Sequence, residues 1–325
     1  MQNEPLVSII IPIYNVEPFI ERCLISTISQ SYSNIEILCI DDCSPDNSIR
    51  IAEKLAEKDS RIKCFNYQEN RGLGGARDYG ISVANGEFVF FLDSDDYLDS
   101  DYVETYVNAV TDDIDIIIGG YVRNEPNVEK RNQPSNTPEG PWLFPSACTK
   151  AFRLKFLKEN NLSFHGIRYY EDVIFNYRCL TAGASLKTID YCGYHYVLNE
   201  NSITRANNQV KKFETYIESH YAFYKEGKWK SLDSNQLDCL VYTFYQSLTI
   251  GLLVNIRHTK PKNARALLDA RNKCLKETFV NYLNNPFVKA GGPSCEQNHI
   301  RNTLKLYHFA EKYHLVWPVI WLLSI

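Results

Sequence analysis

The chain has 325 residues, of which 44% are hydrophobic and 23% are charged, an ordinary composition for a globular protein of one or two domains. The net charge of −4 gives no electrostatic support for nucleic-acid binding, so no nucleic-acid partner is expected. The sequence shows no secretory signal, no apolar run of about 18 residues and no disulfide-dense cysteine pattern, which favours a cytoplasmic protein without a transmembrane helix.

The first 120 residues alternate between apolar strand patterns and helical patterns. The predicted strands cover residues 7–13, 35–40, 61–65, 88–92 and 115–118. Helical spacing of apolar residues occupies the segments between them, at 19–28, 49–56, 75–84 and 103–110. Strands interleaved with helices of this length predict an α/β fold with a mostly parallel central sheet and right-handed crossovers.

The composition changes after this region. Residues 124–141 are dominated by Asn, Pro, Glu, Lys and Gly, which is typical of a surface loop. Residues 142–205 return to mixed apolar and polar segments, and from about residue 208 onward the pattern is helical. We therefore expect a first domain at residues 1–205 and a C-terminal helical region at residues 206–325.

Three acids directly follow the apolar segment 88–92, in the sequence Asp93-Ser94-Asp95-Asp96. Carboxylates are costly to bury at a strand end without partners, but open α/β sheets bind ligands at that place. Paired hard oxygens there suit Mg²⁺ or Mn²⁺ that carries a diphosphate. A turn that caps the next helix is the alternative interpretation of these residues alone.

A second acidic segment follows the second predicted strand. Asp41 and Asp42 can accept hydrogen bonds from a base or a ribose. Ser44 or Asp46 can cap the next helix, but that role does not require the two preceding acids.

Residues 70–78 form a glycine-rich segment between the third strand and the third helix. Glycines let the backbone approach a ligand, a helix N-terminus favours anions, and Arg71 and Arg77 could meet a diphosphate. The segment lacks the GxGxxG order and follows the third strand, which argues against a nicotinamide-binding fold.

Two later polar segments are ambiguous by themselves. Glu171-Asp172 begins a helical pattern, where acids are favoured by the helix dipole whatever their function. His195 lies between two tyrosines, a setting typical of a packed residue.

Together these segments resemble the inverting glycosyltransferases of family 2, which have the GT-A fold. The resemblance is carried in order by residues 7–15, 40–46, 70–78, 86–96 and 171–172, and it covers roughly residues 5–205. Each motif alone is weak, whereas the ordered set is specific. Cys43 stands where the family usually has Gly, and Asp78 where Asn is common. Neither change removes a carboxylate, but Cys43 requires a turn that tolerates a side chain.

The resemblance implies a role for each residue. The donor would be held by Pro12, Tyr14, Asn15, Asp41, Asp42, Arg77, Asp93, Ser94, Asp95 and Asp96. The metal residues would be Asp95, which binds Mn²⁺ or Mg²⁺ directly, and Asp93, which contacts the ribose or a metal-bound water. Arg77 would help with uracil or diphosphate, and Asp96 would support the site from behind or reach the sugar. Asp172 would be the general base.

The predicted function is an inverting, metal-dependent transfer of a sugar from a nucleotide-diphosphate donor, a UDP-hexose or UDP-N-acetylhexosamine. The acceptor would be a hydroxyl of a saccharide or lipid-linked saccharide in cell-surface glycan synthesis. Such a transfer needs one base for the acceptor hydroxyl and a cation for the departing diphosphate. One alternative is a nucleotidyltransferase, which would not explain the Glu171-Asp172 segment in its order. Another is a glycan-binding protein without catalysis, against which the intact carboxylates argue.

Residues 315–325 are apolar and contain two tryptophans. Eleven residues cannot span a bilayer, but they can lie in a membrane interface, with attraction to anionic lipid from basic residues between 257 and 273. The alternative is a tail that packs on the protein or in a homo-oligomer. The first arrangement would make the protein peripheral on the inner face of the cell membrane.

Overall fold

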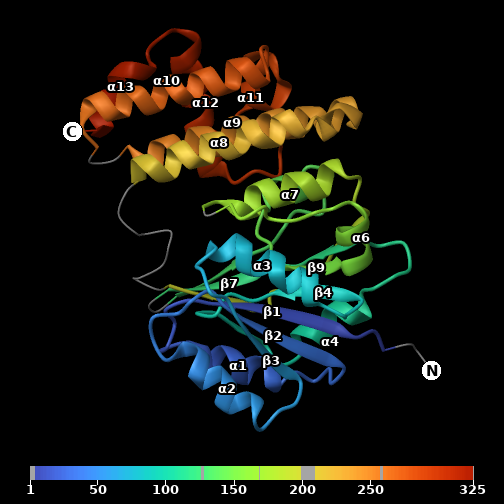
Figure 1. Cartoon of the computed structure of the whole chain (residues 1–325). Coiled ribbons are helices and arrows are strands. Elements are labelled where there is room, and N and C mark those ends of the chain that lie inside the picture. The colour runs from blue at the N-terminus through green and yellow to red at the C-terminus, as the bar shows by residue number, and fades with distance from the viewer. Residues whose placement is uncertain (1–3, 126–127, 168, 199–208, 257–258, 325) are drawn as a thin grey trace. The chain divides into compact units, whose positions relative to one another are not determined.

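The computed structural model describes residues 4–125, 128–167, 169–198, 209–256 and 259–324, whose helices and strands are drawn in Figure 1. The chain forms two compact units. The first consists of Met1–Pro134 with Pro145–Ser202, and the second of Ser135–Phe144 with Ile203–Ile325. All residues of the predicted site belong to the first unit.

A seven-stranded sheet forms the centre of the first unit, in the strand order β10-β6-β9-β4-β1-β2-β3. Its strands are β1 Val7–Ile13, β2 Ile35–Asp41, β3 Ile62–Asn66, β4 Phe88–Phe91, β6 Ile116–Ile118, β9 Lys150–Arg153 and β10 Leu186–Thr188. All neighbours are parallel except β9, which is antiparallel to β4 and β6. The predicted α/β fold with a mostly parallel sheet is therefore confirmed.

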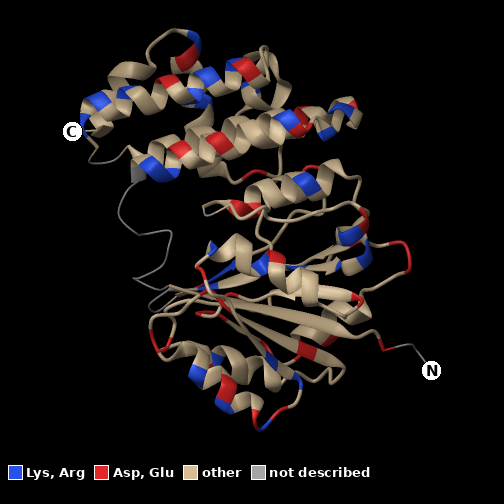
Figure 2. Cartoon of the chain, in the orientation of Figure 1, with Lys and Arg blue, Asp and Glu red and all other residues tan. Residues whose placement is uncertain are grey.

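The sequences of the central strands follow from their burial. Every residue of β1 and β2 is buried, which explains why both read as nearly continuous apolar runs rather than as alternating patterns. Figure 2 shows the long central strands mostly tan, because charged residues lie largely on helices and loops.

The described residues of this unit form the helices α1 Ile20–Ile28, α2 Ser48–Ala56, α3 Gly72–Val83, α4 Tyr102–Asn108, α6 Leu154–Glu159 and α7 Glu171–Thr181. In Figure 1, α3 lies on one face of the sheet, and α1 and α2 lie on the other. A Cβ atom at Gly80 would come within 2.4 Å of Ile10 Cγ2, so the glycine allows α3 to pack closely on β1. Each of the helices α1, α2 and α3 carries the chain from the carboxyl end of one strand back to the amino end of the next, so that the strands run parallel.

The loop predicted at residues 124–141 is wrong in part. A four-stranded sheet, in the order β5-β11-β7-β8, contains β5 Tyr97–Leu98, β7 Tyr121–Glu125, β8 Val128–Asn132 and β11 Tyr194–Val197. The hairpin strand β8 lies at the edge of that sheet, and its first four residues are exposed. An exposed edge strand carries charged residues instead of an apolar alternation, so its composition resembles that of a loop.

The second unit is helical, as predicted. Its helices are α5 Gly140–Leu143, α8 Gln209–Glu226, α9 Ser234–Asn255, α10 Pro261–Thr278, α11 Pro286–Ala290, α12 Asn298–Lys312 and α13 Val316–Ser324. Arg271 of α10 is fully buried, pairs with Glu311 at 2.6 Å and donates to Thr249 Oγ1 at 2.6 Å. Arg271 therefore links three helices and is not one of the surface cations that the sequence suggested.

Among the described residues, α9 has the length and composition of a membrane-crossing helix. Within its apolar window, 61% is buried inside the protein. Its packing partners include α8, α10 and α11 of the same unit.

Candidate active site

The carboxyl ends of β1, β2 and β4 lie at one edge of the sheet, because these strands are parallel neighbours. Most of the predicted site residues lie in or just after these ends: Pro12, Tyr14 and Asn15 at β1, Asp41 and Asp42 at β2, and residues 93–96 at β4. Arg77 comes from α3 and Asp172 from α7. This edge is where open α/β sheets bind ligands.

The end of β1 presents one exposed aromatic ring. Pro12 is buried within the strand, whereas 47% of the Tyr14 surface is exposed. Asn15 has a φ of 55°, a left-handed conformation that Asn tolerates, and its N–H donates to Ser44 Oγ at 2.7 Å. The Tyr14 ring is therefore open to stacking on a planar group of a ligand.

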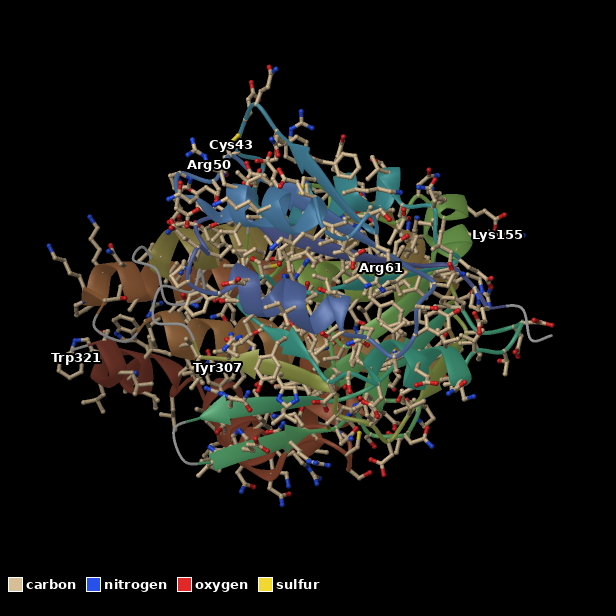
Figure 3. The ribbon with its side chains drawn as sticks, turned by 90° about the horizontal axis from the view of Figure 1, so that it is seen from below. Cys43, Arg50, Arg61, Lys155, Tyr307 and Trp321 are labelled. Atoms are coloured by element: carbon tan, nitrogen blue, oxygen red, sulfur yellow. The ribbon has the colours of Figure 1, made fainter. Side chains whose placement is uncertain are left out.

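Asp41 ends β2 and is buried. Its carboxylate accepts a hydrogen bond from the N–H of Ser44 at 3.2 Å, yet burial raises the pKa of Asp41 above its ordinary value. Repulsion from Asp42 acts in the same direction. Cys43 then takes a φ of 61°, and its Sγ donates to the carbonyl of Tyr67 at 3.1 Å. The turn after β2 thus holds a side chain at the position where the family pattern has Gly; Figure 3 labels Cys43 in this turn.

Asp42 anchors the glycine-rich segment. Its two carboxylate oxygens accept hydrogen bonds from the N–H groups of Arg71, at 2.6 Å, and Gly72, at 2.8 Å. These groups lie at the start of α3, where a negative charge is favoured. A Cβ atom at Gly75 would come within 2.6 Å of Arg71 Cβ, so this glycine also serves local packing. Asp42 and Gly75 therefore both have structural roles at the start of α3.

Arg77 lies at the centre of the predicted site with only 1% of its surface exposed. Nη2 is 2.8 Å from Asp93 Oδ1, and Nη1 is 2.6 Å from Asp172 Oδ1. This placement differs from the expected contact with uracil or diphosphate, because the guanidinium is enclosed and its terminal nitrogens bind carboxylates. Arg77 is instead the bridge between the acids after β4 and the acids of α7.

The acids after β4 divide into exposed and buried side chains. Asp93 and Asp95 are partly exposed, whereas Ser94 and Asp96 are buried. The Asp96 carboxylate accepts hydrogen bonds from the hydroxyl of Tyr194 and, at 2.7 Å, from the N–H of Val197. Burial raises the pKa of Asp96 well above its ordinary value, and repulsion from Asp93 adds to this. Asp96 therefore joins the end of β4 to β11.

The partly exposed pair suits a metal that arrives with its ligand. Among the described residues, no group of three or more His, Cys, Asp and Glu side chains forms a metal cage. Mg²⁺ in nucleotide sites commonly uses one or two carboxylates, with phosphate oxygens and waters completing its coordination. Asp93 and Asp95 fit that pattern, while Asp96 faces inward.

Glu171 and Asp172 begin α7 and differ in exposure. Asp172 has 25% of its side chain exposed, and its Oδ2 accepts a hydrogen bond from the N–H of Ala147 at 3.0 Å. Glu171 is buried, and burial, followed by repulsion from Asp172, raises the pKa of Glu171 to about 8. Although Glu171 Oε1 is 3.0 Å from Arg77 Nη1, its carboxyl is therefore mainly protonated at neutral pH. The charged partners of Arg77 are then Asp93 and Asp172.

His195 lies in β11 of the four-stranded sheet and contacts residues in and just after β5. Its ring stacks on Tyr97 with 4.4 Å between centroids, and its Nε2 is 2.9 Å from Asp99 Oδ1. Only 12% of the side chain is exposed, in keeping with a packed residue.

Sequence reasoning did not identify the groups that hold the site together. The donors from Ala147 and Tyr194 are separated from their acceptors by 25 and 98 residues. A backbone N–H leaves no mark in the sequence, and a tyrosine in an aromatic-rich chain is not distinctive. The low exposure of Arg77 likewise depends on which residues enclose it.

Comparisons with known proteins agree with this geometry. The family model described as Glycosyl transferase family 2 matches residues 8–175, just over half of the 325 residues. The putative glycosyltransferase EpsH of Bacillus subtilis is 28% identical over 330 residues, covering 87% of this chain and 94% of its own.

Solved structures share the fold. TarS of S. aureus, residues 1–349 in complex with UDP-GlcNAc, superposes with a TM-score of 0.72 at 20% identity, covering 95% of this chain and 91% of its own. The mannosyltransferase PcManGT of Pyrobaculum calidifontis, in complex with GDP-Man and Mn²⁺, gives a TM-score of 0.58 at 14% identity, covering 98% and 88%. These likenesses confirm the expected GT-A fold with its C-terminal helical region. By the match to the family model, the chain belongs to glycosyl transferase family 2 and is a glycosyltransferase.

Proposed function

We propose that this chain transfers a sugar, with inversion at the anomeric carbon, from a UDP-hexose or UDP-N-acetylhexosamine to a hydroxyl group. The acceptor is a saccharide or lipid-linked saccharide used in cell-surface glycan synthesis on the cytoplasmic side. The complex of TarS with UDP-GlcNAc supports the donor class, and the sequence resemblance supports the acceptor class.

One observation carries the proposal. A single buried guanidinium, that of Arg77, contacts both Asp93 at the end of β4 and Asp172 at the start of α7. A site for sugar transfer needs a donor-binding group and an acceptor-activating base at a fixed separation. Arg77 supplies that rigid spacing, and its burial leaves little freedom for either carboxylate to move.

The reaction assigns one task to each carboxylate. Asp172 accepts the proton of the acceptor hydroxyl while the hydroxyl oxygen bonds to the anomeric carbon and the bond from that carbon to the diphosphate oxygen breaks. Arg77 and the Ala147 N–H each contact one oxygen of Asp172 and fix the orientation of its carboxylate at the first turn of α7. Glu171, being mainly neutral, does not add a second negative charge.

On the donor side, Asp95 and Asp93 would hold a divalent cation, which neutralises charge on the departing diphosphate when bound. The Mn²⁺ bound by PcManGT supports this assignment. Tyr14, whose ring is exposed, would stack on the base, and Asp41 would accept a hydrogen bond from the nucleoside.

The test uses Asp172→Asn, with Asp112→Asn as the matched control, because Asp112 is an exposed acid of the same unit. UDP release from a panel of UDP-sugars is measured with a saccharide acceptor, in Mn²⁺ and then in EDTA. We expect Asp172→Asn to bind UDP-sugar normally and to lose about 10²- to 10⁴-fold in transfer, the usual contribution of a general base. Asp112→Asn should behave as wild type.

Four results would refute the proposal or parts of it. Normal transfer by Asp172→Asn would assign the base elsewhere. Full activity in EDTA would remove the metal from the mechanism. Pyrophosphate release from a nucleoside triphosphate and a sugar phosphate, without sugar transfer, would indicate a nucleotidyltransferase. Donor binding without any turnover would indicate a binding protein.

A further inference from the structure

The helix α13 is apolar apart from Ser324, and the described residues of its own unit leave much of it uncovered. Its buried residues are Ile320 and Ser324, on the side where the helix contacts α10 and α12. Val316 and Trp317 are half-buried, and Arg265 lies over the Trp317 ring at 5.0 Å. The other large side chains are exposed, at 45% for Val319, 44% for Trp321, 63% for Leu322 and 40% for Leu323. Figure 3 shows the Trp321 side chain pointing away from the ribbon. A helix that is apolar all round is normally covered by a protein core or by a membrane.

The preceding helix, α12, adds an apolar stripe of its own. Leu306, Phe309 and Tyr313 are 72%, 56% and 54% exposed, and their spacing places them on one face of the helix. The rings of Phe309 and Tyr313 contact each other, with 4.7 Å between centroids. Leu304 and Tyr307, on the other side of α12, are buried. Both terminal helices thus expose large apolar side chains that the described chain does not cover.

The charges on these two helices have one sign at the surface. Within the described residues 298–324, Glu311 is the sole acid, and it is turned inward with 10% of its side chain exposed, paired with Arg271 at 2.6 Å. Lys305 and Lys312 are exposed on α12 beside the apolar stripe. The exposed surface of α12 and α13 therefore combines apolar, aromatic and cationic side chains without an exposed acid.

We propose that α12 and α13 form a surface that binds an anionic membrane interface. Trp and Tyr prefer the interfacial region, and lysines beside an apolar face are attracted to anionic headgroups. A symmetric contact with a second copy fits less well, because it would bring Lys305 and Lys312 of both copies together without an acid to pair with them. The sequence left two alternatives for this segment, a packed tail and a membrane contact. In this proposal each describes one face of α13, because one face packs on the protein and the other contacts lipid.

This assignment also changes the source of the attraction to lipid. Half of the basic segment expected to supply it is paired or enclosed: Arg265 pairs with Asp269 at 3.2 Å, Lys273 lies 3.9 Å from Glu277, and Arg271 is buried. Lys260 and Lys262 are exposed, and Arg257 lies outside the described residues. Arg265 of α10 lies over the Trp317 ring at 5.0 Å but also pairs with Asp269, whereas Lys305 and Lys312 lie beside the apolar stripe of α12. They are therefore the residues whose charge the test should reverse.

The experiment measures co-sedimentation of the full chain with vesicles of phosphatidylcholine, with and without phosphatidylglycerol. The apolar variant is Trp321→Ser/Leu322→Ser, and its matched control is Val254→Ser/Val280→Ser, at residues of the same unit that are 55% and 77% exposed. Wild type should bind the anionic vesicles preferentially. The apolar variant should bind them at least about tenfold more weakly, from the apolar area that it no longer buries, and the control should bind as wild type.

A second pair of variants tests the charge. Lys312→Glu should weaken binding by about fivefold or more at low salt, since each cation near an anionic surface contributes about 1 kcal/mol. Lys225→Glu, at an exposed position of α8, is the control and should have little effect. Leu306→Ser/Phe309→Ser provides an independent apolar variant on α12. Circular dichroism and donor hydrolysis, which should be unchanged in all variants, report that the fold and the active site are intact.

Two outcomes would overturn the proposal. The first is equal binding to neutral and anionic vesicles, or equal binding by wild type and the apolar variants. The second is a concentration-dependent dimer, without vesicle binding, that Trp321→Ser/Leu322→Ser dissociates; that result would assign the surface to a second copy of the chain. Neither outcome bears on sugar transfer, which is measured with a soluble acceptor.

Discussion

Arg77 Nη1 lies 2.6 Å from Asp172 Oδ1, and the same guanidinium reaches Asp93 through Nη2 at 2.8 Å. Arg77 is fully buried, so its charge is favourable only because these carboxylates compensate it. Their attraction raises the pKa of Arg77 despite the opposing effect of burial. One side chain thus fixes the relative positions of two acids that are 79 residues apart (93 and 172).

Arg77→Lys should therefore abolish the bridge while keeping a positive charge. An ammonium is a point donor and cannot span two carboxylates as a guanidinium does. We expect sugar transfer to fall about 10²-fold, because misplacement of catalytic groups by about 1 Å has effects of that size. Steady-state transfer assays measure this, and Arg61→Lys, at a partly exposed arginine of the same unit, serves as the control. Arg77→Lys with wild-type transfer would show that the bridge is dispensable.

Asp95 and Asp96 are adjacent, but truncation of Asp96 should lower stability, whereas truncation of Asp95 should weaken metal binding. Asp96→Ala leaves the Tyr194 hydroxyl and the Val197 N–H without their acceptor, so we expect a loss of about 2–4 kcal/mol in the free energy of unfolding. Asp95→Ala should change stability by less than about 1 kcal/mol, as is usual for side chains outside the core, while raising the Mn²⁺ concentration needed for transfer. Denaturant unfolding and metal titrations separate the two effects. A large stability loss in Asp95→Ala with unchanged metal dependence would contradict these roles.

Glu171 should make stability depend on pH. Folding raises the pKa of this carboxyl from 4.5 to about 8, so the folded state holds the proton more tightly. Its contribution to stability is fully present below about pH 4.5 and is lost as the pH rises through about 8. Over that window the free energy of unfolding falls by about 1.4 kcal/mol for each pH unit.

Glu171→Gln isolates this contribution, because it removes the titrating group and nearly keeps the shape. Between about pH 6 and pH 8, wild type should lose about 2 kcal/mol more than Glu171→Gln in urea unfolding. The difference between the two proteins cancels the titration of other groups. Parallel pH profiles would mean that Glu171 does not titrate in this range.

Cys43 is a further point of sensitivity, because its φ of 61° is disfavoured for residues with a side chain. Cys43→Gly relieves that strain but increases the freedom of the unfolded chain, so its stability should lie within about 1 kcal/mol of wild type. Cys43→Val should lose about 1–3 kcal/mol, since a β-branched residue is an outlier in this conformation. Thermal unfolding compares the three proteins, and equal stability of the Val and Gly variants would argue against strain at this turn.

The predictability of the fold differs between its parts. The strands β1, β2 and β4 could be recognised because both of their faces are buried and their sequences are almost wholly apolar. The strand β8 could not be recognised, because most of its side chains are exposed to solvent and show no apolar pattern. The strand β9 could not be recognised either, because it has only four residues. Nothing in its local sequence indicates that it runs antiparallel to β4.

The sequence by itself determined the fold class, the helical nature of the second unit and the positions of the acids along the chain, because periodicity and strand-end motifs are local properties. Only the tertiary structure decided which acids face solvent and which are enclosed. Asp95 and Asp96 are neighbours in sequence, yet one is partly exposed and the other is bound by residues about 100 positions later. The tertiary structure likewise placed Arg77 between Asp93 and Asp172, because burial and charge pairing depend on contacts between segments that the chain brings together only on folding.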